Sequence, residues 1–148
     1  LRKYTNEPYI VHPAEVFSIV SRVDGATEEM MAAAWLHDVV EDTGVTIEVI
    51  RDMFGEKVAE LVGWLTDVSR PEQGNRATRK AIDRAHTAMA PADAQTIKLA
   101  DLISNSRSIM EHDADFAKTY LAEKRLLLEV MTKGDRGLFA EASKYIEV

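Results

Sequence analysis

The sequence predicts a single all-α domain. Apolar residues recur at the three- and four-residue spacing of helices, and no segment alternates as a strand would. No linker, repeat or low-complexity tract divides the 148 residues, of which 46% are hydrophobic, enough for a core. We therefore expect one helical bundle over residues 1–148. We expect its first helix to be largely missing, because the chain begins at Leu1 rather than at a methionine.

Turn and cap signals predict the first two helices. Pro13 suits the first turn of a helix that has His12 at its start. An Asp-Gly pair at 24–25 breaks the chain, after which Thr27 can cap a second helix. This second helix is apolar around most of its circumference as far as Val40, so we expect it to be central and buried.

Shorter helices and a basic helix follow. Thr46 can cap a helix that stops at Gly55, and an i, i+3, i+4, i+7 stripe from Val58 to Leu65 predicts the next one. Residues 69–75 read as a loop. The helix after it carries four basic residues: Arg76, Arg79, Lys80 and Arg84.

Three further helices complete the expected bundle. Pro91 ends the basic helix, and an apolar segment from Ile97 to Ile103 predicts a largely buried helix. Two amphipathic helices are expected near 114–133 and 135–147.

Composition excludes several classes of function. The chain has 18 Lys and Arg against 25 Asp and Glu, a net charge of −7, which disfavours binding to nucleic acid. It has no cysteine, which excludes disulfides, thiolate zinc sites and cysteine nucleophiles. Neither a membrane span nor a signal peptide is evident. We expect a cytoplasmic protein that binds neither nucleic acid nor membrane, in an oligomeric state that the sequence leaves open.

One polar patch interrupts the apolar second helix, in the segment His37-Asp38-Val39-Val40-Glu41-Asp42. If the helix continues through it, His37 stacks beneath Glu41 and Asp38 beneath Asp42. Two like charges at this spacing repel by about 0.2–0.5 kcal/mol on an exposed helix, which a divalent cation would turn into attraction. Burying such groups is costly unless they bind a metal or do chemistry, so we interpret the patch as functional.

A candidate metal site combines this patch with distant residues. Its ligands would be two imidazoles and two carboxylates: His12, His37, Asp38 and Asp101. This set suits Mn²⁺, Fe²⁺, Co²⁺ or Zn²⁺ rather than Ca²⁺, and Glu41 and Asp42 would be candidates for general acid or base catalysis of hydrolysis. Alternatively, Asp101 pairs with Lys98 or Arg107 on its own helix.

The basic helix has two interpretations. Its cations could form a solvated face that pairs with Asp83, as charge runs usually do. In an acidic chain they could equally attract a polyphosphate toward the metal. The same question applies to Arg2 and Lys3.

The motifs resemble those of the HD-domain metal-dependent phosphohydrolases. The resemblance is strongest to the branch that hydrolyses (p)ppGpp, which comprises the RelA/SpoT hydrolase domain and small stand-alone relatives of the Mesh type. The matching stretches cover about the first three quarters of the chain: Arg2-Lys3, Pro8-Tyr9-Ile10-Val11-His12-Pro13, Trp35-Leu36-His37-Asp38-Val39-Val40-Glu41-Asp42-Thr43, and Lys98-Leu99-Ala100-Asp101 with Asn105 and Arg107.

The resemblance implies a role for each matching residue. His12, His37, Asp38 and Asp101 would bind Mn²⁺. Glu41 and Asp42 would position or activate the attacking water. Four residues would contact the guanine nucleotide: Arg2, Lys3, Asn105 and Ser108. The implied reaction removes the 3′-pyrophosphate of (p)ppGpp, giving GDP or GTP and pyrophosphate.

Two departures from the family pattern are visible. Leu102, Ile103 and Ser104 stand where the family commonly carries a basic residue followed by an aromatic residue or histidine. No synthetase domain follows Val148, so we expect hydrolysis alone. The alternatives are an HD-domain phosphohydrolase acting on a nucleoside monophosphate or NADPH, and a non-catalytic HD domain that senses a nucleotide.

Overall fold

The computed structural model describes residues 10–112 and 114–146, and this part of the chain contains helices and no strand. The all-α prediction is confirmed. No helix in these two ranges is long and apolar enough to span a membrane. The elements in chain order are α1 (Val11–Ser21), α2 (Glu28–Leu36), α3 (Val39–Asp42), α4 (Ile47–Phe54), α5 (Glu56–Leu65), the 3₁₀ turn η1 (Pro71–Gln73), α6 (Arg76–Met89), α7 (Ala92–His112), α8 (Ala114–Val130) and α9 (Arg136–Ile146).

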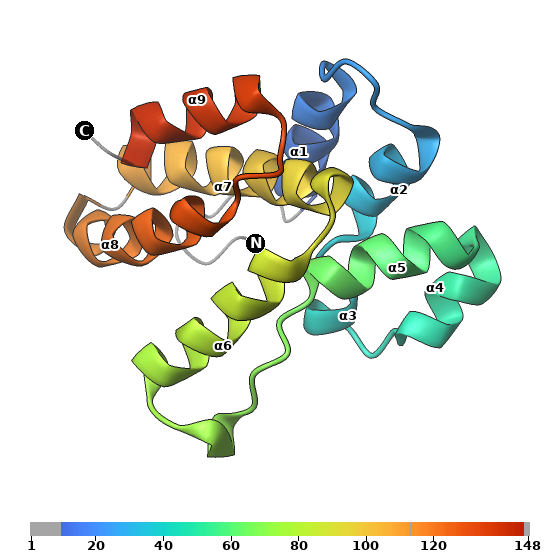
Figure 1. Ribbon diagram of the computed structural model, residues 1–148, viewed down its shortest axis with the longest axis horizontal. Coiled ribbons are helices and arrows are strands. Elements are labelled where there is room, and N and C mark those ends of the chain that lie inside the picture. The colour runs from blue at the N-terminus through green and yellow to red at the C-terminus, as the bar shows by residue number, and fades with distance from the viewer. Residues whose placement is uncertain (1–9, 113, 147–148) are drawn as a thin grey trace.

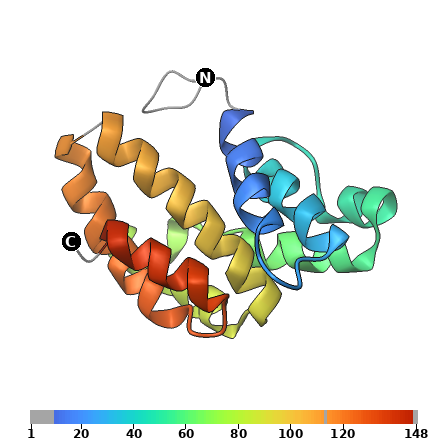
Figure 2. The same cartoon turned by 90° about the horizontal axis from the view of Figure 1, so that it is seen from above.

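The long helix α7 forms the centre of the bundle. It contacts α1, α2 and α5 on one side and α8 and α9 on the other, as Figures 1 and 2 show. Ile97, Leu99 and Ile103 are fully buried, and removing each such side chain from water contributes roughly 1.5–3 kcal/mol. The predicted buried helix is therefore the core helix of the fold.

Local signals place several helix ends where the sequence predicts them. The side chain of Thr27 accepts a hydrogen bond from the backbone N–H of Met30, and Thr46 caps α4 through the N–H of Val49. Gly55 ends α4 with a φ of 95°, a left-handed conformation that favours glycine. The two threonines thus satisfy backbone donors at helix starts, and the N–H of Gly55 donates to the carbonyl of Arg51 at a helix end.

The expectation of one continuous helix through the polar patch was wrong. α2 ends at Leu36, Asp38 adopts a φ of −104° and a ψ of 0°, and a separate turn, α3, follows. The ring N–H of His37 donates to the carbonyl oxygen of Ala34 at 2.7 Å, so the side chain occupies an acceptor of the last turn of α2. The break lets the adjacent residues His37 and Asp38 reach one point, with Nε2 and Oδ2 3.0 Å apart.

The turn between α8 and α9 is fixed against α7. Gln95 is fully buried, donates to the carbonyl of Thr87, and accepts from the backbone N–H of Lys133 at 2.9 Å. Gly134 lies so close to α7 that a Cβ atom there would stand 2.5 Å from a methyl carbon of Leu99. This close approach seats the last two helices on the core.

Candidate metal centre

Three segments supply the candidate ligands. His12 lies in the first turn of α1, His37 and Asp38 form the break between α2 and α3, and Asp101 lies near the middle of α7. One ligand atom from each of the four residues lies within 4.8 Å of the others. The structure therefore brings all four residues together, although their ligation of a metal stays a prediction.

The contacts within this cluster are short. Nε2 of His12 lies 2.8 Å from Oδ1 of Asp101, and Nε2 of His37 lies 3.1 Å from the same oxygen. Both histidines and Asp101 are buried, whereas the side chain of Asp38 is 27% exposed. Two imidazole nitrogens and two carboxylate oxygens thus converge on one point, and the cluster opens toward solvent at Asp38.

Both imidazoles are oriented by hydrogen bonds from their other nitrogen. Nδ1 of His37 donates to the carbonyl of Ala34 at 2.7 Å. Nδ1 of His12 lies 3.0 Å from the hydroxyl oxygen of Ser104, and that hydroxyl donates to Glu15 at 2.5 Å. Since the Ser104 proton goes to Glu15, its oxygen accepts from His12. Each Nε2 is then left with a lone pair for a cation, the usual arrangement at metal-binding histidines.

The electrostatics of the cluster favour positive charge. Burial opposes charge on His37, but Asp101 and Asp38 outweigh it and raise its pKa to about 10. Burial alone would raise the pKa of Asp101, but Lys98 and the two histidines hold it well below its usual range. A proton on His37 or a divalent cation can supply the positive charge that the carboxylates favour.

Asp101 contacts both the histidines and a lysine of its own helix. Its Oδ1 faces the histidines, while its Oδ2 lies 3.4 Å from the amino group of Lys98, as the ion-pair alternative expects. The amide of Asn105 donates to Oδ1 at 3.1 Å. Arg107 instead lines a cavity with Glu15. Asp101 is therefore bound on both oxygens, which fixes its orientation.

Glu41 and Asp42 lie on α3, and both are exposed. Glu41 accepts a hydrogen bond from the backbone N–H of Asp67 at 2.5 Å, which folds its carboxylate against the protein. Partial desolvation of this carboxylate where it lies against the protein, together with the charges of Asp67 and Asp38, outweighs the hydrogen bond and raises the pKa of Glu41 to about 7. A carboxyl group with such a pKa can accept or donate a proton near neutral pH.

The predicted substrate-binding residues fall into three groups. Asn105 lies at the cluster through its bond to Asp101. Ser108, a turn further along α7, is buried and lines the same cavity as Arg107, of about 140 Å³. Arg2 and Lys3 lie outside the described residues.

Sequence reasoning missed the pair Ser104 and Glu15 as supports of His12. Each stands three residues after a candidate ligand, Glu15 after His12 on α1 and Ser104 after Asp101 on α7. Residues three apart share a helix face. The three-residue spacing was the signal available in the sequence. It identifies Glu15 and Ser104 as supports of His12 only once α1 is known to pack against α7.

A family profile described as HD domain matches residues 1–127. A Synechocystis protein named a probable guanosine-3′,5′-bis(diphosphate) 3′-pyrophosphohydrolase is 40% identical over 112 residues, which are 73% of this chain and 14% of that protein. The guanosine-3′,5′-bis(diphosphate) 3′-pyrophosphohydrolase MESH1 of Xenopus tropicalis is 37% identical over 103 residues, 69% of this chain and 56% of that protein. The chain thus spans only part of both relatives.

A solved structure has the same architecture. It is that of a metazoan ortholog of SpoT, which hydrolyses ppGpp and plays a role in starvation responses. The alignment has a TM-score of 0.87 at 25% identity and covers 99% of this chain and 85% of that one. The likeness therefore extends beyond the segments that carry the candidate ligands.

Proposed function

Since this chain belongs to the HD domain family, we propose that it is a metal-dependent pyrophosphohydrolase that removes the 3′-pyrophosphate of (p)ppGpp. The products would be GDP or GTP and pyrophosphate. The observation that carries the proposal is the convergence of two imidazoles and two carboxylates from three distant segments within 4.8 Å. Such a ligand set suits a divalent transition metal, the usual agent of metal-assisted phosphate hydrolysis.

The relatives support the choice of substrate. Two relatives, whose alignments cover about 70% of this chain, are named guanosine-3′,5′-bis(diphosphate) 3′-pyrophosphohydrolases. A solved structure with the same fold is that of a protein that hydrolyses ppGpp. The net charge of −7 favours a small nucleotide over nucleic acid as the ligand. The sequence has no cysteine, which is compatible with a reducing compartment, and we propose a cytoplasmic enzyme.

Four side chains would hold the metal, for which we propose Mn²⁺: His12, His37, Asp38 and Asp101. The ion would act as a Lewis acid that activates water and offsets the negative charge of the phosphate. Asp38 is the most exposed of the four, so the substrate would approach from its side. Ser104 and Ala34 would keep the rings of the two histidines in place.

The acids on α3 would handle the proton of the attacking water. Glu41 follows Asp38 by three residues, and its pKa of about 7 suits it to accept a proton near neutral pH. Asp42 would help to position the water. The nucleotide itself would be held by Arg2, Lys3, Asn105 and Ser108, as the family resemblance implies.

Product analysis tests the proposal. Purified protein is incubated with ppGpp and Mn²⁺, and the products are separated by ion-exchange chromatography. We expect GDP and pyrophosphate, no turnover in the presence of EDTA, and loss of both Mn²⁺ binding and turnover in Asp101→Asn. Asp52→Asn, at an exposed carboxylate on α4, is the control. Orthophosphate as the product, or cleavage of a nucleoside monophosphate or NADPH in place of ppGpp, would overturn the substrate assignment.

A further inference from the structure

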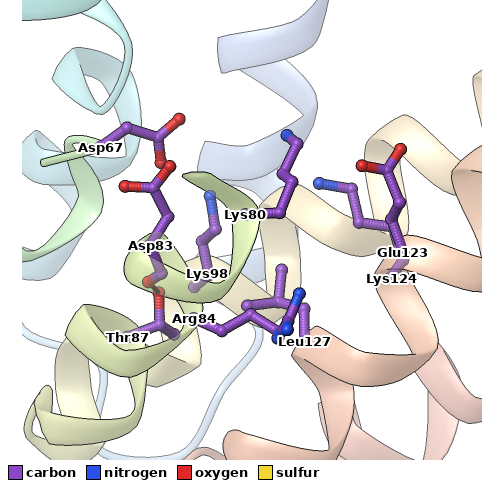
Figure 3. A pocket seen from close by; sticks show the side chains of 9 residues that line it. All are labelled: Asp67, Lys80, Asp83, Arg84, Thr87, Lys98, Glu123, Lys124 and Leu127. Carbon is purple, nitrogen blue, oxygen red and sulfur yellow. Dashed lines mark hydrogen bonds between the residues drawn. The ribbon is translucent and has the colours of Figure 1, made fainter. Parts of the chain in front are cut away.

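A second polar site lies beside the metal centre. It is a cavity of about 60 Å³ between the end of α5, α6, α7 and α8. Four cations line it: Lys80, Arg84, Lys98 and Lys124. Figure 3 shows the amino groups of the three lysines turned to the same side of the cavity. In a chain of net charge −7, such a concentration of positive charge is local.

The carboxylates of this cavity are largely engaged elsewhere. Glu123 pairs with Arg76 at 2.9 Å, and both oxygens of Asp83 accept hydrogen bonds from residues 68–69. These bonds occupy both oxygens of Asp83, which counts against the interpretation that Asp83 pairs with the cations of its own helix. The third carboxylate, Asp67, offsets part of the charge of Lys98. Glu123 lies near enough to Lys80 and Lys124 for their charges to lower its pKa, and the amino group of Lys124 lies 5.2 Å from the centre of the Tyr120 ring.

The lysines repel one another. Burial first, and then the charges of Lys98 and Lys80, lower the pKa of Lys124 to about 8. An anion among the three amino groups would offset this repulsion. A phosphate group, with several acceptor oxygens, matches three converging ammonium donors.

Two contacts connect the cavity to the metal centre. The amino group of Lys98 reaches Oδ2 of Asp101 at 3.4 Å, and the backbone N–H of Asp67 donates to Glu41. A phosphate chain that has one phosphorus at the metal can therefore extend toward the lysines. The cavity has room for several waters, a volume comparable to one phosphate group.

We propose that this cationic cavity binds the outer phosphate of the diphosphate group that the reaction removes, with Lys80 and Lys124 as its binding residues. The inference rests on the proposed function for the origin of the diphosphate. The affinity of the cavity for pyrophosphate itself can be measured without turnover.

Calorimetric titration of pyrophosphate into the Mn²⁺-loaded protein, at fixed free Mn²⁺, tests the proposal. Removing one charged hydrogen-bond donor typically weakens an interaction by about tenfold or more. We therefore expect at least about tenfold weaker binding of pyrophosphate to Lys80→Gln and to Lys124→Gln. Lys124→Arg, which keeps the charge, should bind nearly as the parent does. Lys118→Gln, at an exposed lysine of the same helix α8, should leave the affinity unchanged.

The outcomes separate this inference from the proposed function. Equal affinity in the parent, Lys80→Gln and Lys124→Gln would refute the cavity as a pyrophosphate site, whatever the enzyme hydrolyses. Lysine-dependent binding of pyrophosphate without hydrolysis of ppGpp would refute the proposed function and leave the cavity as a diphosphate site. Thermal unfolding of each variant shows whether it is folded. If Lys124→Arg binds pyrophosphate as tightly as the parent, a packing defect is excluded as the cause of weaker binding in Lys124→Gln.

Discussion

Ser104 carries a prediction that separates support of the metal centre from packing. The residue is fully buried on α7, and its hydroxyl joins Nδ1 of His12 to the carboxylate of Glu15, at 3.0 Å and 2.5 Å. In Ser104→Ala both contacts are lost. The buried N–H of His12 then has no acceptor at this position, and nothing fixes the proton on Nδ1 rather than on Nε2.

The expected size of the effect follows from these contacts. Leaving one buried donor unsatisfied costs about 1–3 kcal/mol, and loss of a hydrogen bond behind a metal-binding histidine typically weakens metal affinity by about 10- to 100-fold. The two ranges agree, because about 1.4 kcal/mol corresponds to a factor of ten. We therefore expect Mn²⁺ to bind Ser104→Ala about 10- to 100-fold more weakly than the parent.

Ser106 offers a matched control on the same helix. It is also fully buried, but its hydroxyl has no hydrogen-bond partner within the described part of the chain. Ser106→Ala removes the same atom without removing a hydrogen bond, so Mn²⁺ affinity should not change. Mn²⁺ binding is measured by titration calorimetry, or by the loss of the electron paramagnetic resonance signal of free Mn²⁺. Equal affinities for the two variants would refute the role assigned to Ser104.

Three further predictions concern the catalytic proton, the charge of His37 and the packing at Gly134. Glu41→Gln should lower kcat by about 10²- to 10⁴-fold. It should also abolish the rise of the rate through pH 7 that the raised pKa of Glu41 implies, with Mn²⁺ affinity retained. A kcat equal to that of the parent would exclude Glu41 as the base. The raised pKa of His37, about 10 against a usual 6.5, means that its contribution to stability is complete below pH 6.5 and is lost as the pH rises through 10. In EDTA, the Tm of the protein should therefore fall across this window, and an increase in Tm would contradict the assignment. Gly134→Ala should lower the free energy of unfolding by about 1–3 kcal/mol, because the added Cβ would meet Leu99. Gly63→Ala, which has open space at its Cβ, should not lower it. Equal free energies of unfolding for the two variants in urea would contradict the close approach of Gly134 to α7.

Local signals predicted most of the helices and the polar patch that contains two of the candidate ligands. Thr27 and Thr46 cap helices because their hydroxyl oxygens accept from nearby N–H groups, an effect confined to a few residues. His12 and Asp101 each have a local alternative, as a helix-start residue and as an ion-pair partner, and the family resemblance joined them to the segment at 37–38.

The features that sequence reasoning missed depend on tertiary contacts. The break after Leu36 accompanies a bond from the His37 ring to the Ala34 carbonyl, and apolar periodicity carries no trace of it. The support of His12 requires α1 to pack on α7. The cationic cavity requires Lys124 of α8 to meet the basic face of α6, and no spacing within either helix encodes that meeting.

The course of α7 has a mechanical consequence. Lys98, Asp101 and Ser104 follow one another at intervals of three residues, so each stands about 4.5 Å further along the axis and about 60° back around it. They form a short spiral that passes from the lysines at one end to the support of His12 at the other. A rigid rod cannot turn one of them without turning all three. Any axial rotation of α7 would therefore move the amino group of Lys98, the carboxylate of Asp101 and the hydroxyl that supports His12 together.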